Sequence, residues 1–240
     1  MRIITPYKYF ADHSDEWLAK EIPTWFSEPK KRRADLQDSQ VKAGTIKSCP
    51  SFVDIFRNSL VLRAPCDCLF NLLGDNYEFI SGECANHKMI NFEYHDIKSQ
   101  MNQEWANDYI HMKLNFNAQM VAETRSKCLF FPPEYHFEEE LSIIKPMLGA
   151  VNLLPNTGVE FNINMLASKR DFLERKEVLI RKGTPLAYVY FPFEEKVSVE
   201  YLPQSEFDNF SFTKTSFSGD YLKAVMKGKE NDQKQLADVD

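Results

Sequence analysis

Glycine is scarce in this chain, at only 8 of 240 residues. Loops that hold phosphate groups through the backbone are usually rich in glycine, and the chain has no such loop ending in Lys-Ser or Lys-Thr. It also lacks a Gly-x-Ser-x-Gly segment and a cysteine in a histidine-paired signature. With no recognisable catalytic motif, the sequence favours a protein that is not an enzyme.

Long apolar runs are missing as well. None approaches the ~20 residues that a membrane-spanning helix needs, and residues 1–10 contain no apolar leader segment. We therefore predict a protein that has no membrane span and is not secreted by the usual route. The five cysteines are an odd number spread through apolar segments, as expected of reduced thiols in a cytoplasm.

Positive charge is in deficit, since 29 Lys and Arg stand against 35 Asp and Glu, for a net charge of −6. This balance repels phosphate backbones and disfavours nucleic acid as a partner. One basic run, from Lys30 to Arg33, opposes the trend. Because Glu28 and Asp35 flank it within a polar stretch, it predicts a solvated linker.

Aromatic residues, in contrast, are plentiful, with 19 Phe and 10 Tyr, and they favour β structure. Apolar and polar residues alternate with period two in segments 60–64, 90–94, 112–117, 159–164 and 197–201, and continuous apolar runs occupy 129–131, 178–180 and 186–193. These patterns predict a mainly β chain that forms a single sandwich or barrel. The residues predicted to face the core are Leu62, Phe92, Leu114, Phe161, Ile180 and Val189.

The chain divides into three predicted regions: an N-terminal helix and polar connector over 1–44, a β domain over 45–205, and a C-terminal helix and polar tail over 206–240. Helices are predicted from Ser14 to Ile22, from Gln100 to Tyr109 and from Asp220 to Lys227, with a single helical turn after Ser51. The polar segments 27–43 and 228–240 have too little apolar surface to offset the cost of ordering them. We expect both to be peripheral.

One set of residues has the composition of a zinc site. Cys66-x-Cys68 followed by Cys84-x-x-His87 offers thiolate and imidazole ligands. The preferred interpretation is that the two cysteines are small apolar residues on a strand, because a Cys-x-Cys pair holds zinc less well than Cys-x-x-Cys. We therefore predict no metal and no cofactor.

Two histidines have carboxylates at the local spacing of a non-haem iron pair. These are His13 with Asp15 and His136 with Glu138. No histidine follows His136 to complete a triad, and His13 lies on a predicted helix away from the predicted strands. We interpret both as surface histidines beside acidic residues.

The segment from Glu177 to Phe193 contains Lys182-Gly183-Thr184-Pro185 and then a long apolar strand. It resembles the closing strands of an uncharacterised protein family of tailed bacteriophages and some bacteria. The stretches from Thr45 to Phe56 and from Val61 to Asp67 are similar to the N-terminal half of that family. The resemblance spans residues 45–195 and implies a phage or phage-derived protein, in a family without an assigned activity.

The same turn is also similar to the ending of the β-clip domain in trimeric dUTPases and dCTP deaminases. Gly183 permits a positive φ between two strands. Gly149 to Asn152, followed by Gly158 to Ile163, resembles the hairpin that holds the nucleoside and a catalytic aspartate in those enzymes. Asn152 stands where the aspartate is expected, and the chain has no Arg-Ser-Ser phosphate motif. We do not carry the chemistry over.

The leading hypothesis is a non-enzymatic phage β protein that acts as a virion component or protein-binding module. Its partner would be another protein or further copies of itself, in the cytoplasm of the infected cell or in the particle. One alternative is a nucleotide-binding β-clip enzyme, and another is a metal-dependent jelly-roll oxygenase.

Overall fold

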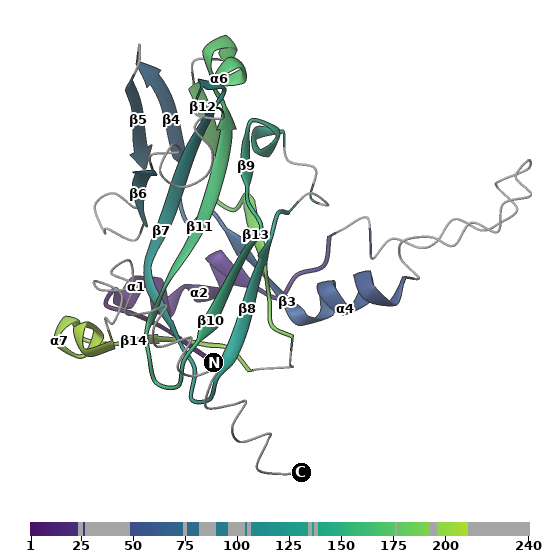
Figure 1. Ribbon diagram of the computed structural model, residues 1–240. Helices are drawn as coiled ribbons and strands as arrows, with labels where there is room; N and C mark the ends of the chain where they lie inside the picture. Colours follow the sequence, from purple (N-terminus) through teal and green to yellow (C-terminus); the bar gives the residue numbers. More distant parts are fainter. Residues whose placement is uncertain are drawn as a thin grey trace, which may run out of the picture.

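The computed structural model describes residues 1–23, 26, 49–73, 76–81, 90–95, 104, 107–133, 136, 139–175, 177–192 and 196–210. Over these residues the protein is mainly β, as the sequence predicts, and the described strands form three sheets with short helices around them (Figure 1). In this part of the chain, no helix is long and apolar enough to cross a membrane. Segments 27–43 and 228–240 and the helix predicted from Asp220 lie outside the described residues.

The largest sheet is built around the long strand β7, in the order β14-β1-β7-β11-β9. β7 pairs with β11 along most of its length, with β6 over its first half and with β1 at its end. The strands are β1 (Arg2–Thr5), β6 (Ile90–His95), β7 (Tyr109–Val121), β9 (Ile144–Pro146), β11 (Val159–Ser168) and β14 (Ser198–Tyr201).

The second and third sheets are joined because two segments of the chain run from one sheet into the other. The second sheet has the order β10-β8-β13-β3-β2 and the third β12-β4-β5. Their strands are β2 (Leu18–Ala19), β3 (Ser59–Arg63), β4 (Cys68–Leu73), β5 (Asn76–Ser81), β8 (Ser126–Phe131), β10 (Gly149–Leu153), β12 (Glu177–Ile180) and β13 (Pro185–Tyr190). Because β3 continues into β4 and β12 into β13, the two antiparallel pairs meet at a corner between residues 64–67 and 181–184.

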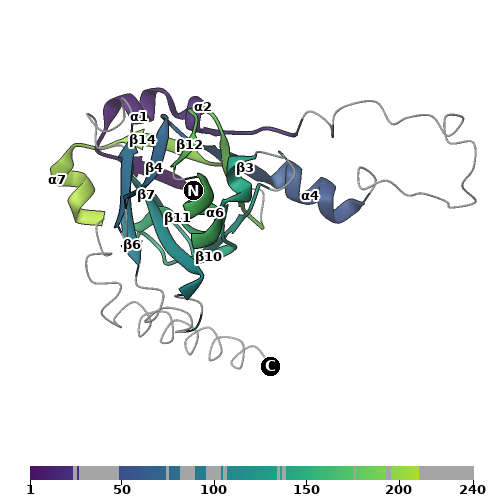
Figure 2. The ribbon, with the colours of Figure 1, turned by 90° about the horizontal axis from the view of Figure 1, so that it is seen from above.

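The described helices are α1 (Lys8–Asp12), α2 (Ser14–Trp17), α4 (Pro50–Asn58), α6 (Lys169–Arg175) and α7 (Gln204–Phe207), with 3-10 turns η6 (Glu140–Ser142) and η7 (Asp208–Phe210). α4 projects away from the sheets in both ribbon views (Figures 1 and 2). Pro50 suits its first turn, where an amide hydrogen has no partner inside the helix. The sequence predicts only a single turn here, and the helix is longer.

Two other helix predictions are wrong at their ends. The helix expected from Ser14 to Ile22 ends at Trp17, because Leu18 and Ala19 pair with β3. Tyr109, the expected end of a mid-chain helix, instead begins β7. In both places pairing with a distant strand overrides the local helical pattern.

The main core cluster contains buried residues from all three sheets. Five of the residues predicted to face it are buried, namely Leu62, Leu114, Phe161, Ile180 and Val189, and the side chain of Phe92 lies outside the described residues. The ring of Phe161 on β11 lies 5.6 Å from that of Phe116 on β7 and 5.7 Å from that of Phe130 on β8, measured between centroids. An aromatic cluster therefore joins the first and second sheets.

The N-terminal segment contributes to this core. β1 lies between β14 and β7, and Ile3 and Ile4 on it are buried. The Trp17 ring stacks on Phe10 at 4.0 Å between centroids, and its Nε1–H donates to the carbonyl oxygen of Phe10 at 2.9 Å. The sequence predicts a helix here and no strand, so β1 and its place inside the sheet are additions from the structure.

β7 departs from the prediction that its second face is solvated. Its polar face carries His111, Lys113, Asn115 and Gln119, and all four are buried. Lys113 Nζ lies 3.0 Å from Glu160 Oε2 on the neighbouring strand β11. The alternating pattern is correct, but it separates an apolar buried face from a polar buried face.

Candidate functional site

The predicted zinc ligands fall only partly within the described chain. Cys66 and Cys68 are buried, and the Cys68 Sγ–H donates to the carbonyl oxygen of Cys66 at 3.4 Å. Cys84 and His87 lie outside the described residues. Within the described residues, no three His, Cys, Asp or Glu side chains gather as a metal site would require. The prediction that these four residues bind no metal therefore stays a prediction.

The histidine pairs have different surroundings. His13 is exposed between α1 and α2, with its Nδ1 3.3 Å from Glu16 Oε1. His136 is partly buried, 5.5 Å from Tyr188 between ring centroids, and Glu138 lies outside the described residues. For His13, the interpretation as a surface histidine beside an acid fits its exposure and its Glu16 contact.

The segment containing Asn152 does not form the expected hairpin. In the described ladders, β10 pairs with β8, where Asn152 stands opposite Lys127, whereas β11 pairs with β7 and β9. The connection between them passes Asn156, whose φ is +55°. The chain therefore crosses from one sheet to another at this point, instead of folding back on itself.

The segment Lys182-Gly183-Thr184-Pro185 forms the corner between the second and third sheets. Gly183 has a φ of +87°, which confirms the predicted positive φ and explains the glycine. Its amide hydrogen is donated to the carbonyl oxygen of Ala64 at 2.8 Å, and the Ala64 amide donates to Thr184 at 2.9 Å. Two sheets are thereby held together where their strands bend.

Charged side chains surround this corner in matched pairs. Arg63 forms an ion pair with Glu21 and also donates to the carbonyl oxygen of Gly183. Lys182 Nζ lies 2.8 Å from Glu16 Oε2, and the Lys182 hydrogen bond holds the pKa of that carboxyl below its usual range. The pairs attach residues 16–21 to the corner, beside a cavity of about 400 Å³. The geometry is that of a structural junction.

His136 lines the same cavity. Its Nε2 atom is buried without a hydrogen-bond partner among the described residues. Burial, with a smaller contribution from the positive charge of Arg63, lowers the pKa of His136 from about 6.5 to about 4. The imidazole is therefore neutral at pH 7 and is poorly suited to donate a proton in catalysis.

We expect His136 to make the fold less stable in acid. Between pH 6.5 and pH 4 the unfolded chain binds a proton at this residue and the folded chain does not, so stability falls as pH falls through this window. For a partly exposed group, the loss should be about 1–2 kcal/mol after solvent screening. Urea denaturation at pH 7 and pH 4.5 should show this loss in the wild type and a smaller one in His136→Gln. Equal losses in both would contradict the assignment.

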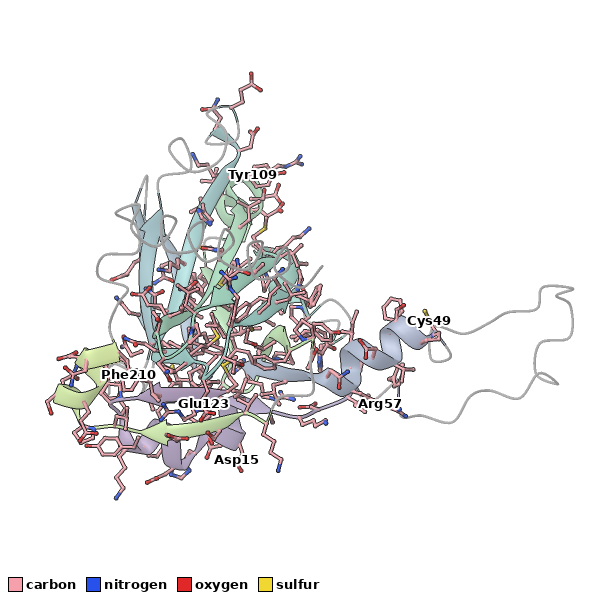
Figure 3. All side chains as sticks on the ribbon, turned by 60° about the horizontal axis from the view of Figure 1, so that its bottom comes forward. Asp15, Cys49, Arg57, Tyr109, Glu123 and Phe210 are labelled. Atoms are coloured by element: carbon pink, nitrogen blue, oxygen red, sulfur yellow. The ribbon has the colours of Figure 1, made fainter. Side chains whose placement is uncertain are left out.

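The end of the molecule where β7 begins and β11 ends carries exposed apolar side chains. Tyr109 is 37% exposed and Leu173 of α6 is 61% exposed. Both line a cavity of about 580 Å³, together with Lys169, Arg170 and Glu174. We call these five residues the tip, and Tyr109 marks it in Figure 3.

The sequence builds the tip through a local helix cap and a contact between distant segments. The Ser168 Oγ accepts a hydrogen bond from the Asp171 amide at 3.3 Å at the start of α6. The Lys169 amide donates to Asp108 at 2.8 Å, which attaches the helix to the start of β7. α6 is absent from the helices predicted above, although Ser168 three residues before Asp171 is a local signal for such a cap.

The tip combines the residue types found at protein interfaces. Aromatic and arginine side chains are enriched at such interfaces. Burial of a leucine that is more than half exposed contributes favourably to the free energy of binding. The ion pair of Arg170 with Glu174, at 3.4 Å between Nε and Oε1, is exposed and contributes little to stability.

Comparison with known proteins finds no matching family model, curated protein or solved structure.

Proposed function

We propose that the protein is a non-catalytic β module that binds another phage-encoded protein through the tip. It acts as a component of a tailed-phage particle or in the cytoplasm of the infected cell. The observation that carries the proposal is the pair of exposed apolar side chains, Tyr109 and Leu173, beside a cavity and flanked by charges of both signs. The phage setting rests on the resemblance of residues 45–195.

The charge of the chain supports a protein partner over nucleic acid. A net charge of −6 repels a phosphate backbone, whereas the tip presents Lys169 and Arg170 beside Glu174. Such mixed charge suits a polar rim around an apolar centre. A partner with an apolar recess and both signs of charge fits this surface.

We further propose that the three sheets belong to one sandwich-like body that presents the tip rigidly. Support comes from the contact of Phe161 on the first sheet with Phe130 on the second, beside the contact of Phe161 with Phe116 within the first sheet. The corner at Gly183 links the second sheet to the third. A rigid body of this kind favours binding, because less conformational freedom is lost when the partner docks.

Replacing Leu173 by aspartate should abolish association with the partner without unfolding the chain. The change places a charge at the centre of the tip, and we expect at least a tenfold loss of affinity, or about 1.4 kcal/mol. Particles of the encoding phage, purified on a density gradient after complementation with each variant, would be probed for the chain. The matched control is Leu148→Asp, since Leu148 is 66% exposed on the connection between β9 and β10.

The wild type and Leu148→Asp should sediment with particles or bind one purified phage protein, and Leu173→Asp should do neither. Melting temperatures would establish that both variants are folded. Equal binding by wild type and Leu173→Asp would contradict the role of the tip. If the wild type neither sediments with particles nor binds a purified phage protein, the proposed function is contradicted.

A further inference from the structure

A third cavity, of about 570 Å³, lies where α4 passes into β3. Segments far apart in the sequence line it: the residue after β2, the junction of α4 with β3, and the connection from β13 to β14. Its polar lining residues are Lys20, Arg57, Asn58, Ser59 and Lys196. We call it the basic pocket.

The charge of the basic pocket is opposite to that of the whole chain. Three cationic side chains, Lys20, Arg57 and Lys196, line it, and its described lining includes no carboxylate. Two carboxylates described on the same segments, Glu21 and Asp54, have other partners. Glu21 pairs with Arg63, and Asp54 accepts hydrogen bonds from Asn58 at 2.7 Å and Tyr190 at 2.8 Å. An anion in the pocket would thus meet cations without a competing carboxylate from these residues.

Ser59 provides an independent observation. It is 1% exposed, it belongs to the lining, and its Oγ has no hydrogen-bond partner among the residues described. A buried hydroxyl without a partner is unfavourable, because it has lost hydration without replacing it. A ligand oxygen bound in the pocket would give this hydroxyl the partner that the described residues do not provide.

Of the three cations in the basic pocket, only Arg57 has a role in its own helix that could explain its position. It lies in the last turn of α4, where a cation interacts favourably with the carbonyl end of the helix. In Figure 3 it lies nearer the body of the molecule than Cys49, which precedes the helix. Helix stabilisation accounts for neither Lys20 nor Lys196, which reach the pocket from other segments.

We propose that the basic pocket binds a small molecule that carries a phosphate group. The planar guanidinium of Arg57 matches two phosphate oxygens, the two lysines add point charges, and the Ser59 hydroxyl supplies a neutral donor. The cavity falls in the usual volume range of small-molecule sites, roughly 300–1,000 Å³. Phe191, which is buried in the lining, provides an apolar wall for the body of an organic phosphate.

Calorimetric titration of the full chain would test this site. The probes are inorganic phosphate, pyrophosphate, a set of nucleoside monophosphates, a set of sugar phosphates and a short single-stranded oligonucleotide, with sulfate and citrate as anion controls. The test variants are Arg57→Gln with Lys196→Gln, and Ser59→Ala. Lys127→Gln, at an exposed lysine on β8 outside the lining of the pocket, is the control for the loss of a surface positive charge. Thermal melting without ligand would show that each variant is folded.

We expect at least one phosphate probe to bind, and its affinity to fall at least about tenfold in the double variant and measurably in Ser59→Ala. Lys127→Gln should bind as the wild type does, and the preferred probe distinguishes free phosphate from nucleotide and sugar sources. No binding by any phosphate probe, or equal binding of sulfate and citrate, would overturn the proposal. Tighter binding of a single-stranded oligonucleotide would also overturn it and assign the pocket to nucleic acid. The tip takes no part in this test. Phosphate binding by the basic pocket and protein binding by the tip are therefore tested independently.

Discussion

Replacing Phe161 by alanine is expected to lower the free energy of unfolding by about 3–5 kcal/mol. The side chain is fully buried, and its ring lies among Trp17, Phe116 and Phe130, which come from the N-terminal segment and from two different sheets. Alanine would remove the contacts of all three rings at once and leave a cavity that rigid sheets fill poorly.

Urea denaturation would measure this change through the shift in midpoint at an unchanged slope. Leu173→Ala serves as the control, because an exposed leucine should change stability by less than about 0.5 kcal/mol. A loss below about 1 kcal/mol in Phe161→Ala would show that the two sheets do not share this cluster.

Replacing Trp17 by alanine should have a comparable effect, about 3–5 kcal/mol. Trp17 is 1% exposed, stacks on Phe10, and lies 5.9 Å from Phe161 and 6.1 Å from Phe116 between ring centroids. The change also removes the hydrogen bond from Nε1 to the Phe10 carbonyl oxygen. It therefore tests directly whether residues 1–19 are part of the core.

The matched control for Trp17 is Tyr9→Ala, since Tyr9 lies on α1 and is 48% exposed. It should have a small effect on the midpoint. Because Trp17 and Phe161 are in contact, their double variant should lose less stability than the sum of the two single losses. A Trp17 effect no larger than that of Tyr9 would place the N-terminal segment outside the core, and full additivity would show that Trp17 and Phe161 are not coupled.

The sequence predicts those strands that alternate or run apolar over several residues. β3, β6, β7, β8, β11, β12, β13 and β14 all coincide with such segments. β2 and β9 have only two and three residues, too few to show a period, so only pairing with neighbours defines them. β1 has only four residues, and the helix predicted from Ser14 to Ile22 covers β2.

The candidate sites are harder to predict because their residues meet only after folding. The turn at Gly183 is a local signal, and its positive φ follows from the sequence. Arg63 and Glu21 become its neighbours through pairing of distant segments, which no local pattern reveals. Lys20, Arg57 and Lys196 each resemble an ordinary solvated cation until the topology places them around one cavity.

The most direct test of the account is cross-linking from the tip during infection. A photoreactive amino acid at position 173 in the full chain should join it to one phage-encoded protein, identified by mass spectrometry, and the same group at position 148 should not. The purified pair should then bind in vitro, and Leu173→Asp should weaken this binding at least about tenfold. No cross-link at position 173, or the same product from both positions, would contradict the claim that the tip is the binding surface.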